Sequence, residues 1–261
     1  MRPLAAALLS LGLAALAGPA AAQDAQAATT GRRFEAVYSV RARGITAGDF
    51  NYSFRQSGAS YEANASRRIT GLLRLTVGDS QDYTYSVRGA VAEDGVLRPT
   101  AYRHQGGRRD RIVDVRFTGD DIVTTANPGM GMGNPPATRA QKAGAIDQLS
   151  AIASMVVASG DPCSRTLKVY MDGRARFDFV MRPNGRVNVN GPAFHGQALR
   201  CSVAFRPIAG FSDPQEAATL TFLFAPTSQG MYAPVRIEMP SDNGLVVLDA
   251  RELTVNGTRL H

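Results

Sequence analysis

Three histidines are the first residues to examine for metal or acid–base chemistry. They stand far apart at His104, His195 and His261, with no H-E-x-x-H or other paired spacing. His104 lies at the tip of a basic hairpin, His195 lies in a loop flanked by Gly and Pro, and His261 is the last residue. We therefore expect surface or loop positions for all three, and no metal site.

A nucleophile or a pair of carboxylates would be the next sign of catalysis. No G-x-S-x-G elbow is present. Asp172 and Asp178 are the acids nearest to forming a pair, but Asp172 suits a turn before Gly173 and Asp178 suits the polar side of an alternating strand. The sequence therefore predicts a protein that is not an enzyme and that holds no cofactor.

The densest basic cluster surrounds a Gly106-Gly107 hairpin. Arginine can pair with phosphate in a bidentate manner, so the cluster is a candidate site for phosphate or a lipid headgroup. A charged edge hairpin that resists aggregation explains the same residues without a ligand. The cluster contains Arg98, Arg103, His104, Arg108, Arg109 and Arg111, and the candidate anion-binding residues are Arg103, Arg108, Arg109 and Arg111.

The first 22 residues have the pattern of a signal peptide. A positive Met1-Arg2 precedes the apolar run Leu4–Ala17, and small residues at 20–22 predict cleavage after Ala22. The run is too short to span a membrane stably, and no Cys follows the cleavage site to carry a lipid anchor. We therefore expect a soluble periplasmic protein, with residues 23–32 forming a mobile tail.

The charge of the chain points towards anionic surfaces. The formal net charge is +7, and Lys142 and Lys168 are the only lysines, so the basic side is almost wholly Arg. An exported protein of this charge is attracted to anionic lipid or polysaccharide, so an anionic membrane surface is a candidate partner. Arginines that solvate strand faces explain the same composition. The export signal argues against nucleic acid as a partner.

Two cysteines in an exported chain predict one disulfide, Cys163–Cys201. A close C-x-x-C pair, which would be more typical of redox catalysis, is absent. The bridge would close a loop of about 40 residues and contribute about 4 kcal/mol in the chain-entropy model. Cys201 alternates with Leu199 and Val203, so we expect it to face the core.

Most of the chain alternates at period two, as at Phe50, Tyr52 and Phe54, which predicts half-buried strands. Turn signals at Asp172-Gly173, Asn184-Gly185 and Asn243-Gly244 predict hairpins. We expect a mainly β fold of about a dozen antiparallel strands. One domain would span 33–258, with two β halves joined by a loop (127–139) and a helix (146–158).

The helix is predicted from apolar residues at spacings of three and four. They are Ile146, Leu149, Ile152, Ala153, Val156 and Val157. We expect the strands to form a curved sheet, open barrel or β-spiral wrapped around this central helix. Because the helix is too slim to fill such a sheet, we expect an apolar cleft at one open end, covered by the 127–139 loop. The alternative is a core packed to normal density.

Several short motifs follow one another in a fixed order along the chain. They are Tyr38-x-Val40, Gly44-Ile45-x-Ala47-Gly48, Gly95-Val96-Leu97-Arg98-Pro99-x-x-Tyr102, Asp147-x-Leu149-Ser150, Asp172-Gly173-Arg174, Cys201 with Phe205-x-Pro207-Ile208-Ala209-Gly210-Phe211, and Pro234-Val235-Arg236-Ile237. With these motifs the sequence resembles the bacterial domain of unknown function 3108, across about residues 34–256. This resemblance implies an exported, β-rich envelope protein and assigns no reaction. In architecture it is also similar to periplasmic β-spiral envelope-integrity proteins and half-barrel lipoprotein carriers.

These observations favour a non-enzymatic periplasmic protein of the cell envelope that binds a lipid or lipoprotein moiety, or an envelope protein partner. Two alternatives stay open. One is a hydrolase acting on an envelope polymer, which would need an acid, His195 and a nucleophile in one cleft. The other is a purely structural envelope-integrity protein, which would need no cavity. The sequence leaves the ligand and the oligomeric state undetermined.

Overall fold

The computed structural model describes residues 31–70, 82–119, 121–157, 160–228, 230–241 and 244–261. Residues 31–261 form one compact unit. The predicted signal peptide lies outside the described residues, as do residues 23–30 of the predicted tail and Asn243 of the third predicted turn. None of the described helices is long and apolar enough to cross a membrane.

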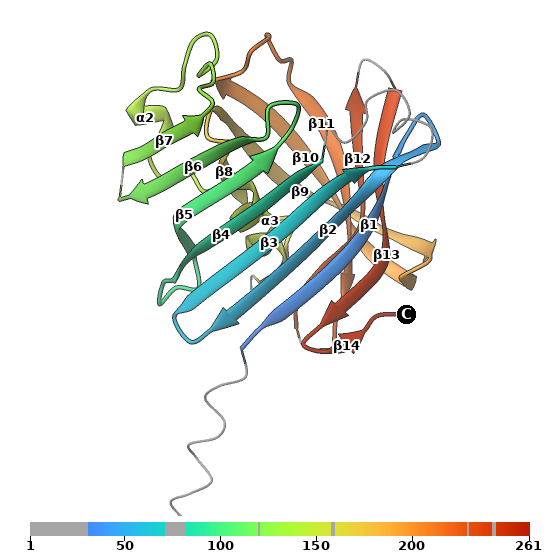
Figure 1. The fold of residues 1–261 in the computed structure, drawn as a ribbon. Helices are drawn as coiled ribbons and strands as arrows, with labels where there is room; N and C mark the ends of the chain where they lie inside the picture. Colours follow the sequence, from blue (N-terminus) through green and yellow to red (C-terminus); the bar gives the residue numbers. More distant parts are fainter. Residues whose placement is uncertain (1–30, 71–81, 120, 158–159, 229, 242–243) are drawn as a thin grey trace, which may run out of the picture. The chain divides into compact units, whose positions relative to one another are not determined.

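The described chain is mainly β, and its strands form one open antiparallel sheet, as the sequence predicts (Figure 1). The strand order is β7-β6-β5-β4-β3-β2-β1-β13-β12-β11-β10-β9-β8, and β14 pairs with β13 alone. The strands are β1 (Arg33–Ala42), β2 (Ile45–Ser57), β3 (Ser60–Ile69), β4 (Tyr83–Val91), β5 (Leu97–Gly106), β6 (Arg111–Thr118), β7 (Asp121–Asn127), β8 (Thr166–Met171), β9 (Ala175–Gly191), β10 (Phe194–Ala209), β11 (Ala218–Pro226), β12 (Tyr232–Ser241), β13 (Gly244–Val255) and β14 (Thr258–Arg259).

Side-chain alternation explains how the strands bury one face. In β2, Tyr52 and Phe54 are each 2% exposed, whereas Arg55 beside them is exposed. Phe54 stands opposite Phe34 of β1, and Tyr52 opposite Ala36, so aromatic and small side chains alternate across the pair. Pairs of this kind stabilise an antiparallel sheet with one buried and one solvated face.

Of the hairpins predicted at Asp172-Gly173 and Asn184-Gly185, the structure contains the first and not the second. Asp172-Gly173 joins β8 to β9 with φ values of 51° and 71°, as a tight hairpin turn requires, so this prediction is confirmed. The hairpin predicted at Asn184-Gly185 is wrong, because both residues lie within β9. The register with β10 shifts there, between Leu199 and Cys201, so Gly185, at φ 79°, belongs to a β-bulge.

Two helices, α2 (Arg139–Lys142) and α3 (Gln148–Val157), lie among the described residues. The α3 helix starts at Gln148 and not at Ile146, because Ile146 forms a parallel bridge with Val169 of β8. Its side chains are apolar on more than the one predicted face, and it contacts β3, β4, β5, β8 and β12. The buried residues are Leu149, Ser150, Ala151, Ala153, Met155, Val156 and Val157.

The loop between β7 and α2 is attached to the end of β10. Asn134 N donates to Phe211 O at 2.9 Å, and Gly210 N donates to Pro135 O at 2.8 Å. A Cβ on Gly133 would lie 2.2 Å from the carbonyl carbon of Gly210, so only glycine fits there. These bonds tie the loop to the strand end, and Met130 and Ala137 of the loop pack against the apolar core. That the loop covers an apolar cleft stays a prediction.

The predicted disulfide Cys163–Cys201 is confirmed, with the two Cα atoms 5.2 Å apart. Both cysteines are buried, and they pack with Met155 of α3 and Phe222 and Phe224 of β11. The bridge ties the segment between α3 and β8 to β10, two strands further into the sheet. It therefore fixes the position of the chain immediately after the helix.

We expect the double substitution Cys163→Ala/Cys201→Ala to lower the free energy of unfolding by about 4 kcal/mol, because the unfolded chain regains loop entropy. Urea denaturation followed by circular dichroism measures the change, with the exposed Ser164→Ala as control. Finding two free thiols in the unreduced, denatured wild-type protein would contradict the disulfide itself.

Candidate functional site

The two ends of the strand order, β7 and β8, are bridged by residues 139–148 (Figure 1). We call this bridged region the seam. On one side, Lys142 Nζ donates to Ile122 O of β7 at 2.5 Å. On the other, Ile146 N donates to Lys168 O at 2.9 Å, and Tyr170 N donates to Ile146 O at 2.8 Å. The segment therefore bonds to three backbone groups of the two edge strands, Ile122 O, Lys168 O and Tyr170 N, which an open edge would leave unpaired.

A polar cluster lies at one end of the seam and joins β5, α3 and the β8–β9 turn. Gln148 Nε2 donates to Asp172 Oδ1 at 2.6 Å, and Tyr102 OH donates to the same oxygen at 3.1 Å. His104 Nδ1 lies 3.3 Å from Tyr102 OH and 3.7 Å from Asp172 Oδ1. Three polar side chains, two from β5 and one from α3, thus converge on the carboxylate of Asp172.

The expectation that His104 lies at the surface is wrong, because this side chain is only 7% exposed. The cause is a bulge in β5. Arg88 pairs with Ala101 and Gly89 pairs with Pro99, so Thr100 is an extra residue. One extra residue reverses the alternation and turns Tyr102 and His104 inwards, which a regular strand would not do.

Burial governs the protonation of this cluster. Burial lowers the pKa of His104, the Arg111 and Arg174 charges lower it further, and only Asp172 opposes them. Burial also raises the pKa of Tyr102 well above its usual value, and the negative charge of Asp172 adds to this. A neutral imidazole and a neutral phenol beside one carboxylate form a hydrogen-bonded clamp across the seam.

A second buried cluster begins α3. Asp147 is fully buried, and its Oδ1 accepts hydrogen bonds from Leu149 N at 2.9 Å and Ser150 N at 3.0 Å, as a helix N-cap does. Ser150 Oγ donates to Asp147 Oδ2 at 2.5 Å and lies 2.7 Å from Tyr61 OH. Tyr52 OH donates to Leu149 O at 2.9 Å. These bonds fix the start of the helix against β2 and β3.

Four of the cavities in the described part of the chain have volumes of about 370, 540, 740 and 870 Å³. The smaller two lie on the solvated sheet face over polar side chains such as Asn64. The largest lies between the β9–β10 hairpin tip and β12–β13, where Arg41 pairs with Asp249, and Arg236 Nε lies 2.9 Å from Glu238 Oε1. Arg41 and Arg236 are thus paired with acids of the same lining, whereas Arg251 of this lining pairs with Asp49 outside it.

The cavity of about 740 Å³ lies at the other end of the seam, and we call it the amphipathic cleft. It opens between the β4–β5 turn, the end of α3 and the start of β8. Its apolar lining is Val96, Leu97, Ile146, Val157 and Leu167, and its charged lining is Arg32, Glu93, Asp94, Arg165 and Lys168. Apolar walls with a few charged groups are typical of ligand sites.

Two arginines of the amphipathic cleft hold the end of α3. Arg32 Nη1 donates to Val157 O at 2.5 Å, and Arg165 Nη1 donates to Ser154 O at 2.8 Å. Cations at this end of a helix offset its partial negative charge. Both arginines therefore have a structural role at the wall of the cleft.

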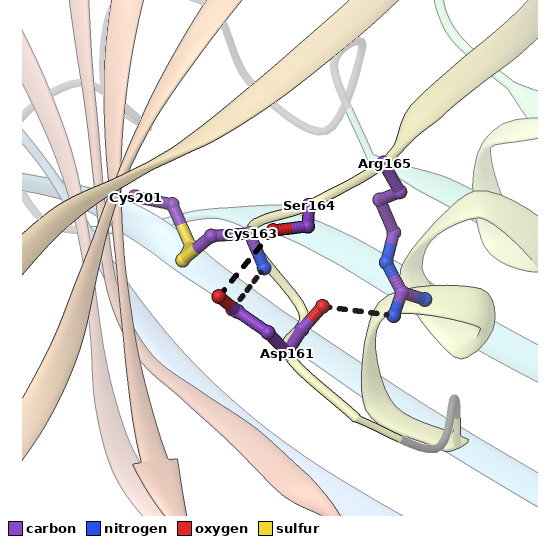
Figure 2. Close-up of a disulfide and its surroundings, with 5 residues drawn as sticks. All are labelled: Asp161, Cys163, Ser164, Arg165 and Cys201. Atoms are coloured by element: carbon purple, nitrogen blue, oxygen red, sulfur yellow. Dashed lines mark hydrogen bonds between the residues drawn. A yellow bond between two sulfur atoms is a disulfide. The ribbon is translucent and has the colours of Figure 1, made fainter.

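Asp161 connects the disulfide to Arg165, as Figure 2 shows. Asp161 accepts a hydrogen bond from Cys163 N at 2.8 Å, and Arg165 Nη2 donates to Asp161 O at 3.3 Å. Burial lowers the pKa of Arg165. Its Nε is buried and has no hydrogen-bond partner. The two hydrogen bonds to Ser154 O and Asp161 O use only one N–H of each Nη, so the guanidinium at the cleft wall keeps unbonded N–H donors.

The four candidate anion-binding arginines differ in their hydrogen-bond partners and in their exposure. Arg103 forms a bidentate pair with Asp114 at 2.7 and 2.9 Å. Arg111 donates to Pro128 O at 2.8 Å and Gly129 O at 3.2 Å. Arg108 and Arg109 are exposed in the β5–β6 turn. Two of the four thus have structural partners, and anion binding by the patch stays a prediction.

The remaining histidines lie apart from the seam. His195 was expected in a loop, but it is an exposed residue of β10 opposite Asn190, because the hairpin turn comes earlier, between Gly191 and Phe194. His261 is exposed at the end of the chain. Within the described residues, no three His, Cys, Asp or Glu side chains come close enough to hold a metal ion.

Sequence reasoning missed Asp147, Gln148 and Arg165. The Asp147-x-Leu149-Ser150 motif was a usable signal, because an Asp followed by Ser three residues later suits a helix N-terminus. Arg165 carries no such signal, since its partners Ser154 and Asp161 are known only once the chain has folded.

We expect Asp147→Asn to remove a pH dependence of stability. Burial raises the pKa of Asp147 from 3.8 to about 6, while its hydrogen bonds oppose the change. The folded state therefore holds this proton more tightly than the unfolded state, and the resulting stability, about 3 kcal/mol, is present below pH 3.8 and lost as the pH rises through 6. Asn keeps the cap but does not titrate.

Urea unfolding of both proteins at pH 4 to 8 measures this effect. The difference in unfolding free energy between wild type and Asp147→Asn should shift in favour of the variant as the pH rises. The exposed Asp213→Asn controls for the loss of a carboxyl group. A difference that stays constant over this range would show that the carboxyl ionises without cost.

Comparison with known proteins gives the family of the chain. A family model described as "Protein of unknown function (DUF3108)" matches residues 37–251, which covers most of the sequence. No curated protein and no solved structure matches it. The match spans the seam, the disulfide and the amphipathic cleft apart from Arg32, and the chain belongs to the DUF3108 family.

Proposed function

We propose that this protein is a non-enzymatic periplasmic protein of the cell envelope, and that it binds a lipid or lipoprotein acyl moiety in the amphipathic cleft. Its sheet would curve around α3, with the seam as the line where the two ends of the sheet approach each other. The predicted signal peptide supports the location.

The contacts of α3 support the curvature. The helix contacts β3, β4 and β5 in one part of the strand order and β8 and β12 in the other. Its side chains enter three separate apolar clusters, with Leu149 in one, Met155 in the second and Ala151 in the third. A flat sheet offers a helix one face, so contacts with both parts favour a sheet that curves around it.

The observation that carries the binding proposal is the composition of the cleft. Val96, Leu97 and Leu167 line it together with a guanidinium that has an unbonded N–H. A volume of about 740 Å³ lies within the usual range of small-molecule sites. Each buried methylene of an acyl chain would contribute about 0.8 kcal/mol, so a short stretch of chain supplies micromolar affinity.

The alternatives receive less support. A hydrolase built on His195 would need this residue in a cavity, and His195 lines none of the four cavities. The hydrogen-bonded clamp of Tyr102, His104 and Asp172 is accounted for by the joining of β5 to the β8–β9 turn. A purely structural protein gives no reason for a cleft whose walls are both apolar and cationic.

We expect the mature protein, from Gln23 onwards, to bind a fluorescent fatty-acyl probe saturably. Val96→Asp should weaken binding about tenfold, because it places a charge in the apolar wall. Val96 is 50% exposed, so the fold should tolerate the change. Val123→Asp is the matched control, because Val123 is 48% exposed and lies on β7, away from the cleft.

Fluorescence titration of the three proteins decides the proposal. Absence of saturable binding by the unsubstituted protein would contradict it, and so would equal losses in the two variants. Capture of an envelope protein by a surface that Val96→Asp leaves intact would favour the protein-binding alternative.

A further inference from the structure

We infer that the amphipathic cleft selects an amphiphile with an anionic phosphate or carboxylate headgroup, and that Arg165 is the residue that receives this headgroup. The inference rests on the proposed function, since it names the ligand class of the same site. It depends on three features: an unbonded donor, an excess of cations and apolar walls beside them.

The unbonded donors belong to the Arg165 guanidinium. A guanidinium has five N–H donors, and Nη1 and Nη2 of Arg165 each donate one, to Ser154 O and Asp161 O. Nε is buried without a partner, so the second N–H groups of Nη1 and Nη2 are the donors left for a ligand. An anionic oxygen in the cleft that Arg165 lines would accept them in charge-assisted hydrogen bonds.

The local charges favour an anion modestly. Arg32, Arg165 and Lys168 outnumber Glu93 and Asp94 among the lining residues. Asp94 Oδ1 also accepts a hydrogen bond from Val96 N at 3.0 Å, which holds this acid in the β4–β5 turn. An excess of one positive charge steers an anion weakly, so selectivity must come mainly from hydrogen bonding at close range.

The end of α3 would otherwise repel an anion, because unpaired carbonyl groups there carry partial negative charge. Arg32 and Arg165 donate to two of these carbonyls, Val157 O and Ser154 O. The same guanidiniums thus neutralise the helix end and leave positive charge at the cleft wall. Lys168 is exposed on β8 and adds a mobile cation at the rim.

The apolar lining completes the ligand class. Leu97, Ile146 and Leu167 lie along the same cavity as the cations. Free phosphate would contact the donors alone and leave the apolar walls in contact with water. A single-chain lipid would contact both the donors and the apolar walls. The geometry therefore favours a phosphate or carboxylate carried on an acyl chain.

The test compares three probes below their micelle concentrations by isothermal titration calorimetry: monododecyl phosphate, 1-monolauroylglycerol and inorganic phosphate. We expect monododecyl phosphate to bind at least tenfold more tightly than the neutral lipid, and inorganic phosphate to bind in the millimolar range. The tenfold preference corresponds to about 1.4 kcal/mol, which one charge-assisted hydrogen bond supplies.

Three variants locate the selectivity. Arg165→Lys keeps the charge but removes the guanidinium N–H donors, and it should reduce the preference to threefold or less. Lys168→Gln, at an exposed position, should weaken only the anionic lipid, about twofold, in a salt-dependent way. Arg108→Gln/Arg109→Gln removes two charges from the basic hairpin and should change nothing.

The outcomes separate this inference from the proposed function. If neither lipid binds, the proposed function fails. If both lipids bind equally, the function stands and the headgroup inference is wrong. Inorganic phosphate binding as tightly as monododecyl phosphate would make the site one for free phosphate. Loss of selectivity in the Arg108/Arg109 variant would move the site to the hairpin. Should Arg165→Lys fail to fold, equal binding of monododecyl phosphate and 1-monolauroylglycerol by the unsubstituted protein would still overturn the inference.

Discussion

The connection between β7 and β8 is the constraint on which the rest of the structure depends. An open sheet has two edges whose backbone groups must be covered, and a buried face that must be filled. Residues 139–157 contribute to both needs, since Lys142 and Ile146 bond to the two edge strands and Leu149 and Val156 of α3 pack in the apolar core. Asp147, which caps α3, lies between the residues that bond to the edge strands and the helix. Both polar clusters and the cleft therefore border this one segment.

The strands were predictable because their signals are local. Alternation at Phe50–Phe54, the Asp172-Gly173 turn and the Cys163–Cys201 pair each follow from a few neighbouring residues, and the structure confirms them. The errors at Asn184-Gly185 and His104 have one cause. A β-bulge adds a residue whose effect depends on the partner strand, so the face of every later residue changes without any change in the pattern.

The candidate site was less predictable, since no single motif contains it. Arg32, Val96, Ile146 and Arg165 come from four separated segments and meet only after the sheet has formed. The basic hairpin attracted attention because its charges are adjacent in sequence, yet Arg103 and Arg111 there have protein partners. Charges that are neighbours in the sequence show only that the local charge density is high. A binding site depends instead on donors that have no protein partner after folding.

In the proposed role, Arg165 would serve both the fold and a ligand. Its Nη atoms donate to Ser154 O and Asp161 O, so the guanidinium is already oriented in the absence of a ligand. A preorganised donor loses less conformational entropy on binding than a free surface arginine does. The disulfide adds to this orientation, because Cys163 lies two residues before Arg165 and is fixed to β10 (Figure 2). The covalent bond that stabilises the domain therefore also fixes the segment that carries Arg165, and a fixed guanidinium would let a cleft with an excess of only one positive charge select a headgroup.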